Sequence, residues 1–118
     1  MPSNIWIQKE FLLEFKMSEN LIDLVKIIRS RKNKDEDKSY TSSLLSGGLS
    51  KCIEKMEEEF SELKEALNNN SNIVNEATDT IYHLLVTLEV AGIKFEDVLK
   101  ELENRKKQSG IEEKNSRL

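Results

Sequence analysis

Apolar residues recur at intervals of three and four through the middle of this 118-residue chain. Between residues 49 and 67 this spacing places them on one stripe of an α-helix, whose period is about 3.6 residues. The stripe consists of Leu49, Cys52, Ile53, Met56, Phe60, Leu63 and Leu67. The chain has a single Pro, and aromatic residues make up only 6% of it, so little in it opposes helices or favours strands. We therefore predict an all-α fold.

Three further segments have the same helical period. They cover residues 20–31, 72–91 and 95–107. The charged run at residues 29–38 is typical of a loop, and the Ser/Thr/Gly segment at residues 39–48 has room for a single helical turn. An Asn-rich connection joins the second and third long helices tightly. Ser71 is the predicted N-cap of the third helix, and Gly92 its predicted C-terminal stop.

The length is that of one domain with a small core. We predict an N-terminal extension at residues 1–16, a helical domain at residues 17–108 and a basic C-terminal tail at residues 109–118. Apolar residues make up only 37% of the chain, which suits a protomer that completes its core with a partner chain. Cys52 is the single cysteine, so it has no disulfide partner within the chain, and its helical phase predicts a buried thiol.

Composition also excludes several classes of partner. The formal net charge of −4 argues against general nucleic-acid binding, which requires a basic surface. No apolar run approaches the ~20 residues of a membrane span. The first residues lack the layout of a secretory signal, so we predict a cytoplasmic protein without membrane contact.

Acidic residues form two groups on neighbouring predicted helices. Glu58, Glu59 and Glu62 lie in one helix, and Glu76 and Asp79 lie early in the next. Acids three or four residues apart project from the same side of a helix. If the two helices pack antiparallel, their carboxylates converge, and such an arrangement requires a cation. Oxygen ligands alone favour a hard cation, so we predict Mg²⁺, with Mn²⁺ as a second possibility.

The helical phase selects a ligand set among these acids. Relative to the apolar stripe, Glu59 and Glu62 fall on one shoulder, and Glu58 lies further round. In the next helix a narrow polar line runs along a mostly apolar surface, and it includes His83. The predicted metal ligands are Glu59, Glu62, Glu76 and Asp79. Three plainer interpretations stay open: a solvated acidic face, a salt bridge from an acid to a lysine, and a core histidine at position 83.

The acid pattern, Glu-Glu-x-x-Glu followed by Glu-x-x-Asp, resembles that of the MazG-like all-α nucleotide pyrophosphatase superfamily. Three further blocks resemble phosphoribosyl-ATP pyrophosphohydrolase, an enzyme of histidine biosynthesis. They are SYTSSLL with GGL at residues 39–49, EATDTIYHLLV at residues 76–86 and RKKQSGIEEKNSR at residues 105–117. The resemblance covers residues 19–117. Glu57 and Phe60 depart from it, because the family usually has small residues there, and we expect altered packing rather than lost chemistry.

The resemblance implies a MazG-like helical bundle completed by dimerisation. It also implies magnesium-dependent hydrolysis of phosphoribosyl-ATP to phosphoribosyl-AMP and pyrophosphate. Either Glu58 or Glu62 could then serve as the general base for an attacking water. The residues predicted to contact the substrate are Lys55, His83, Arg105, Lys114 and Arg117. Two alternatives remain: a house-cleaning nucleoside triphosphate pyrophosphohydrolase of the same superfamily, and a non-enzymatic helical interaction protein.

Overall fold

The computed structural model describes residues 19–32, 39–106 and 115, and all regular structure among them is helical. The predicted all-α class is therefore confirmed for this part of the chain. Residues 19–30 form the first helical segment, and four further helices follow it among the described residues. They are α2 (Tyr40–Ser46), α3 (Leu49–Asn69), α4 (Ile73–Val90) and α5 (Phe95–Arg105). The predicted N-terminal extension and nearly all of the predicted C-terminal tail lie outside the described residues.

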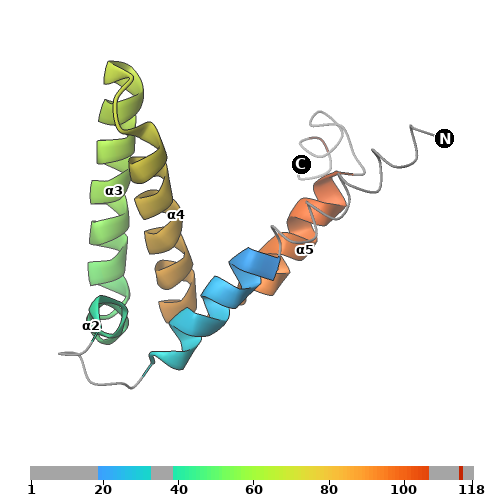
Figure 1. Cartoon of the computed structure of the whole chain (residues 1–118). Helices are drawn as coiled ribbons and strands as arrows, with labels where there is room; N and C mark the ends of the chain where they lie inside the picture. Colours follow the sequence, from blue (N-terminus) through green and yellow to red (C-terminus); the bar gives the residue numbers. More distant parts are fainter. Residues whose placement is uncertain (1–18, 33–38, 107–114, 116–118) are drawn as a thin grey trace.

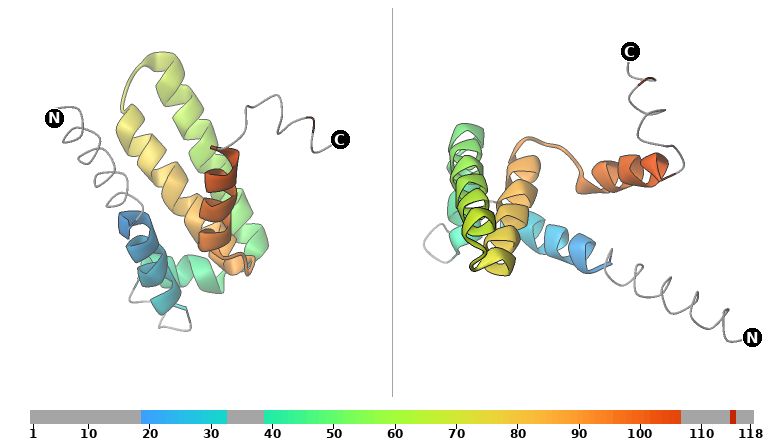
Figure 2. Two further views of the ribbon diagram at one scale, coloured as in Figure 1. Left: turned by 90° about the vertical axis from the view of Figure 1, so that its right-hand side faces the viewer. Right: turned by 90° about the horizontal axis from the view of Figure 1, so that it is seen from above.

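An antiparallel hairpin of α3 and α4 dominates the molecule (Figure 1). The short helix α2 lies across its open end, where α3 begins and α4 finishes. Helix α5 leaves that same end and leads away from the hairpin, as two further views confirm (Figure 2). Residues 39–48 thus contain a helix of seven residues rather than the single turn that the sequence predicted. Ser39 caps it, because its side chain accepts a hydrogen bond from the backbone N–H of Ser42.

Two asparagines make the reversal between α3 and α4. Asn70 and Asn72 have φ values of 50° and 58°, in the left-handed region that Asn tolerates better than most residues. The prediction that Ser71 caps α4 is wrong, and the N-cap is Asn72. Ser71 lies inside the turn between the two left-handed residues, and its backbone N–H donates to the carbonyl of Ala66 to close α3.

The face of α3 that packs against α4 differs from the predicted stripe. Cys52 and Ala66 are the buried residues of this helix, and Glu59 lies half-buried between them. Much of the predicted apolar stripe faces away from the hairpin instead. Its exposed members are Leu49, Ile53, Phe60 and Leu67. Periodicity placed these side chains on one face correctly, but α4 covers a neighbouring face of the helix.

The apolar core lies at the open end of the hairpin. It is built by Val25, Ile28, Leu44, Cys52, Leu85 and Val86. The prediction that Cys52 is buried is confirmed, and its Sγ donates to the carbonyl of Leu44. Gly92 ends α4 as predicted, with φ of 78° and with the backbone N–H of Ile93 returning to the carbonyl of Leu88.

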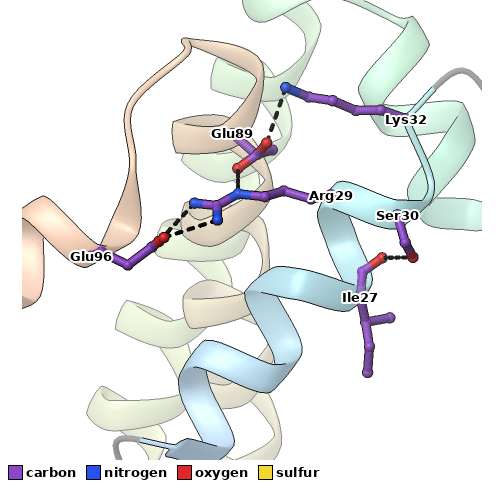
Figure 3. A network of polar contacts seen from close by, with 6 residues as sticks. All are labelled: Ile27, Arg29, Ser30, Lys32, Glu89 and Glu96. Carbon is purple, nitrogen blue, oxygen red and sulfur yellow. Dashed lines mark hydrogen bonds and ion pairs between the residues drawn. The ribbon is translucent and has the colours of Figure 1, made fainter.

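A network of charged groups joins the first helical segment to α4 and α5 (Figure 3). Arg29 Nε donates to the buried Glu89 carboxylate at 3.0 Å, and Lys32 Nζ contacts the other oxygen of that carboxylate at 3.0 Å. The remaining guanidinium nitrogens of Arg29 donate to both oxygens of Glu96, at 2.9 and 2.7 Å. A planar guanidinium suits such a bidentate contact. Arg29 therefore fixes where α5 begins relative to the rest of the molecule.

The Arg29–Glu96 contact predicts an acid-sensitive contribution to stability. Hydrogen bonds from Arg29 lower the pKa of Glu96 from 4.5 to about 2. A carboxyl with a lowered pKa stabilises the fold above its unfolded pKa, and this contribution disappears as pH falls from 4.5 towards 2. We expect Glu96→Gln to cost about 0.5–1 kcal/mol at pH 7, since the pair is partly exposed to solvent.

The measurement is thermal unfolding of wild type and variant between pH 7 and pH 2.5. The difference between the two proteins should shrink towards zero at the acid end. Glu103→Gln is the matched control. Glu103 also forms an ion pair, but its partner Lys106 is only three residues further along the chain, so this pair does not join α5 to another helix. A constant difference across the whole pH range would contradict the role given to this contact.

Candidate metal centre

The α3–α4 hairpin brings three carboxylates together. One oxygen atom from each of Glu59, Glu62 and Glu76 lies within 4.8 Å of the others. Glu59 and Glu62 project from α3, and Glu76 projects from the first turn of α4. Mg²⁺ binds oxygen at about 2.0–2.1 Å, so three oxygens at this spacing can converge on one ion after small side-chain rotations. We call these three residues the carboxylate cluster.

The carboxylate cluster is electrostatically incomplete by itself. Glu59 Oε2 and Glu76 Oε2 are buried and have no hydrogen-bond partner. Burial raises the pKa of both carboxyls, and the neighbouring Glu62 raises each further. Buried anionic oxygens without partners are costly and rarely persist in folded proteins unless something binds them. A hard divalent cation supplies what these oxygens lack, so the residues present fit the predicted metal.

The ion pairs that the described residues form with one another use other acids. The acids concerned are Glu58, Glu89, Glu96, Glu101 and Glu103. The alternative in which Glu76 or Asp79 forms a salt bridge to a lysine is therefore not what this part of the chain adopts. Within residues 19–32 and 39–106, the lack of a basic partner distinguishes the cluster from an ordinary structural network.

Asp79, the fourth predicted ligand, lies beside the carboxylate cluster rather than within it. It is half-buried, one turn after Glu76 on α4. Its charge adds to the raised pKa of Glu59 and of Glu76. Its carboxylate oxygens do not join the group of three that the described coordinates bring together.

Glu58 and Lys55 pair with each other at the edge of the site. Lys55 Nζ contacts Glu58 Oε2 at 3.1 Å, and both side chains are largely exposed. Of the two residues predicted as possible general bases, Glu62 thus belongs to the cluster and Glu58 does not. Lys55 is partly exposed, and its charge also acts on Tyr40, where it lowers the pKa.

His83 is buried, and both of its ring nitrogens have partners within the protein. The backbone carbonyl of Asp79 is only an acceptor, so Nδ1 at 2.8 Å from it carries the proton. In the neutral ring Nε2 is then the acceptor, and the Tyr40 hydroxyl donates to it at 2.9 Å. The pattern predicted His83 as a substrate contact, but in this arrangement it holds Tyr40 in place.

Tyr40 is a neighbour of the site to which the sequence analysis assigned no role. It begins α2, and its side chain is 57% exposed. Burial of the hydroxyl raises the pKa of Tyr40, and the charges of Glu59, Glu58 and Asp79 add to this increase. Its position between α2 and the acids depends on tertiary packing, so spacing along the chain carried no signal of it.

A hollow of about 210 Å³ adjoins the carboxylate cluster on the side of the turn between α3 and α4. Its lining is polar apart from one alanine. The lining residues are Glu62, Glu65, Ala66, Asn69, Ser71, Asn72 and Glu76. A ligand held by the cluster could therefore extend towards this turn.

Arg105, one of the basic residues predicted to bind substrate, is not near the cluster of its own chain. Arg105 is the last residue of α5, which leads away from the hairpin (Figure 1). It contacts Glu101 on the same helix at 3.4 Å. Lys114 and Arg117 lie outside the described residues.

Comparison with known proteins identifies a family and several relatives that this chain resembles. A family model described as phosphoribosyl-ATP pyrophosphohydrolase matches residues 21–106, which include every acid discussed above. Relatives named phosphoribosyl-ATP pyrophosphatase occur in several bacteria. The protein of Rhizobium etli is 40% identical over 83% of this chain and 94% of its own length. That of Azorhizobium caulinodans is 42% identical over 86% and 97%, and that of Dechloromonas aromatica is 44% identical over 80% and 89%.

The repulsion within the carboxylate cluster predicts how a neutral replacement affects stability. A carboxyl with a raised pKa destabilises the fold above that pKa, and the penalty is relieved as pH falls through it towards the unfolded value of 4.5. Glu59→Gln should therefore raise the melting temperature of the metal-free protein at pH 7 by a few degrees. The same variant should lose the stabilisation by Mg²⁺, which for wild type is about 1.4 kcal/mol at an ion concentration about ten times the dissociation constant.

Thermal unfolding with Mg²⁺ and with EDTA tests this expectation. Glu57→Gln is the matched control, since Glu57 is an exposed acid of α3 outside the cluster, and it should respond to Mg²⁺ as wild type does. If Glu59→Gln destabilises the metal-free protein, or keeps the full response to Mg²⁺, Glu59 is not a ligand.

Proposed function

We propose that this chain, which belongs to the phosphoribosyl-ATP pyrophosphohydrolase family, hydrolyses phosphoribosyl-ATP to phosphoribosyl-AMP and pyrophosphate in histidine biosynthesis. The observation that carries the proposal is the pair of buried carboxylate oxygens of Glu59 and Glu76 that lack partners beside a third acid. Such a site is built for a hard cation, and a hard cation in turn binds the phosphates of a nucleotide. Family and site thus lead to the same chemistry.

We propose Glu59, Glu62 and Glu76 as direct ligands of Mg²⁺, with Mn²⁺ as a substitute. Asp79 completes the set through its own carboxylate or through a water held beside the cluster. The ion, when bound, would neutralise charge on the phosphates and lower the pKa of a coordinated water. No covalent nucleophile is required, and the buried Cys52 is not placed to act as one.

The proton of the attacking water requires an acceptor, and Glu62 suits this role better than Glu58. Glu62 belongs to the cluster and is exposed, so the carboxylate oxygen of Glu62 that does not bind the ion can take the proton and pass it on to solvent. The Glu58 carboxylate is engaged by Lys55. Lys55 lies at the open edge of the site, where its ammonium group suits contact with a substrate phosphate.

We propose that the protein is a homodimer. In the isolated chain α3 carries exposed apolar side chains at nearly heptad spacing, and α4 carries a second set. The members on α4 are Val74, Ile81 and Leu84. Exposed apolar faces of this extent on a helical hairpin are typical of helix–helix interfaces. We call these two sets the apolar hairpin face.

A dimer would also account for the position of Arg105. Helix α5 leads away from the hairpin of its own chain, so Arg105 cannot serve that chain's cluster (Figures 1 and 2). Contacts from Arg105, Lys114 and Arg117 to a substrate would then be made at the cluster of the partner chain. His83 as a substrate contact stays a prediction, and so does a cytoplasmic location. No helix among the described residues is both long and apolar enough to cross a membrane.

Activity is tested by pyrophosphate release from phosphoribosyl-ATP with and without Mg²⁺, beside a panel of ordinary and damaged nucleoside triphosphates. We expect metal-dependent release from phosphoribosyl-ATP alone. Glu59→Gln and Asp79→Asn should each lower kcat/KM by about 100-fold or more, because they remove charge from the metal site.

Glu57→Gln, which changes an exposed acid of α3 outside the cluster, is the control that should retain activity. Turnover of the panel in place of phosphoribosyl-ATP would move the protein to the house-cleaning branch of the superfamily. No turnover of any substrate in the presence of Mg²⁺ would favour the non-enzymatic alternative.

The homodimer is tested by sedimentation equilibrium of wild type and of Phe60→Glu. Phe60 is 50% exposed and belongs to the apolar hairpin face, so a charge there should be buried without a partner in a dimer. We expect the variant to sediment as a monomer at concentrations where wild type is dimeric. Ser61→Glu, which adds the same charge at the next and exposed position, should remain dimeric. A monomeric wild type would refute the proposal.

A further inference from the structure

Asn72 occupies an unusual position at the start of α4. It is the N-cap of that helix, yet its side chain makes no capping hydrogen bond. Its backbone is left-handed, with φ of 58° and ψ of 28°, whereas an N-cap residue normally has extended backbone that directs its side chain to the first N–H groups. The amide of Asn72 is thus available for another purpose.

That amide is directed to a residue of the carboxylate cluster. Asn72 Nδ2 donates to Glu76 Oε1 at 3.3 Å, across one turn of helix. The other carboxylate oxygen, Glu76 Oε2, is buried and has no partner. The contact therefore uses one oxygen of Glu76 to fix the side chain and leaves the second oxygen free. Asn72 also lines the hollow beside the cluster, next to Glu62 and Glu76.

We propose that Asn72 is a positioning residue for the metal ligand Glu76. The inference rests on the proposed metal site and extends it to a residue that is not itself a ligand. Outer partners of this kind orient ligating side chains and raise metal affinity. A neutral amide suits the task, because it holds the carboxylate without cancelling the charge that attracts the cation. A lysine at the same place would compete with the ion.

The turn itself provides a matched comparison. Asn70 and Asn72 are both exposed and both left-handed, and they are separated by one residue. The Asn72 side chain donates to Glu76, whereas the contribution of Asn70 to the turn comes from its backbone, whose N–H returns to Ala66. Glycine adopts left-handed backbone without strain, so replacing either asparagine by glycine preserves the turn.

The experiment measures Mg²⁺ and Mn²⁺ binding by calorimetry to the wild-type protein, to Asn72→Gly and to Asn70→Gly. Loss of one exposed hydrogen bond to a ligand should raise the dissociation constant of Asn72→Gly by about threefold to tenfold, at the lower end of effects of outer partners. Asn70→Gly should bind as wild type does. Circular dichroism and melting temperature without metal should be similar for both variants.

The outcomes separate this inference from the function on which it rests. Equal affinities for wild type and Asn72→Gly, or an equal loss in both variants, would overturn the role of Asn72 and leave the metal site intact. A wild-type protein that binds neither ion would overturn the proposed metal site and the role of Asn72 with it. A selective loss in Asn72→Gly would establish the positioning role.

Discussion

Acidic side chains held between two antiparallel helices are the constraint on which the rest of this structure depends. The packed face of α3 does not consist only of apolar residues, because Glu59 lies between the buried Cys52 and Ala66. Threonines of α4 hold the two helices in contact there. Thr80 Oγ1 shares its proton between the carbonyl of Glu76 at 2.8 Å and that of Glu59 across the interface at 3.2 Å. Thr87 Oγ1 does the same with His83 at 2.7 Å and Cys52 at 3.3 Å. Both contacts lie on the open-end side of Glu62 and Glu76, and the turn between α3 and α4 joins the helices on the other side.

The molecule divides stability and chemistry between the two ends of the hairpin. The open end contains the apolar core and the network around Arg29, in which the buried Glu89 has two basic partners. The other end contains the carboxylate cluster, in which buried oxygens have none. Both ends bury carboxylates, but among residues 19–32 and 39–106 only the open end supplies basic partners for them. A site for a cation must keep its negative charge, which destabilises the fold. The packing and ion pairs at the opposite end of the same two helices compensate for this cost.

The sequence predicted the features that depend on residues close together in the chain. The helical period located all the long helices to within two residues, and left-handed backbone explains why asparagines cluster where α3 meets α4. The helical period could not predict which face of α3 packs against α4. An apolar stripe has the same period whether it contacts a helix of the same chain or another molecule. The bond from Tyr40 to His83 and the bidentate contact of Arg29 join residues 43 and 67 positions apart, so no spacing rule reaches them. Asp79 was grouped with the ligands by its helical phase and by the Glu-x-x-Asp pattern, and its role as a ligand stays a prediction.

The structure shows where Glu57 and Phe60, the two departures from the family pattern, lie on α3. Glu57 and Phe60 stand where small residues are usual, and small residues would suggest close helix packing at those positions. Both side chains are exposed, and neither is on the face that α3 presents to α4. Their size therefore does not separate the helices or disturb the carboxylate cluster. Phe60 instead adds an aromatic ring to the apolar hairpin face. Because aromatic side chains contribute strongly to interfaces, we infer that the substitution acts on assembly of the protein and leaves its metal chemistry unchanged.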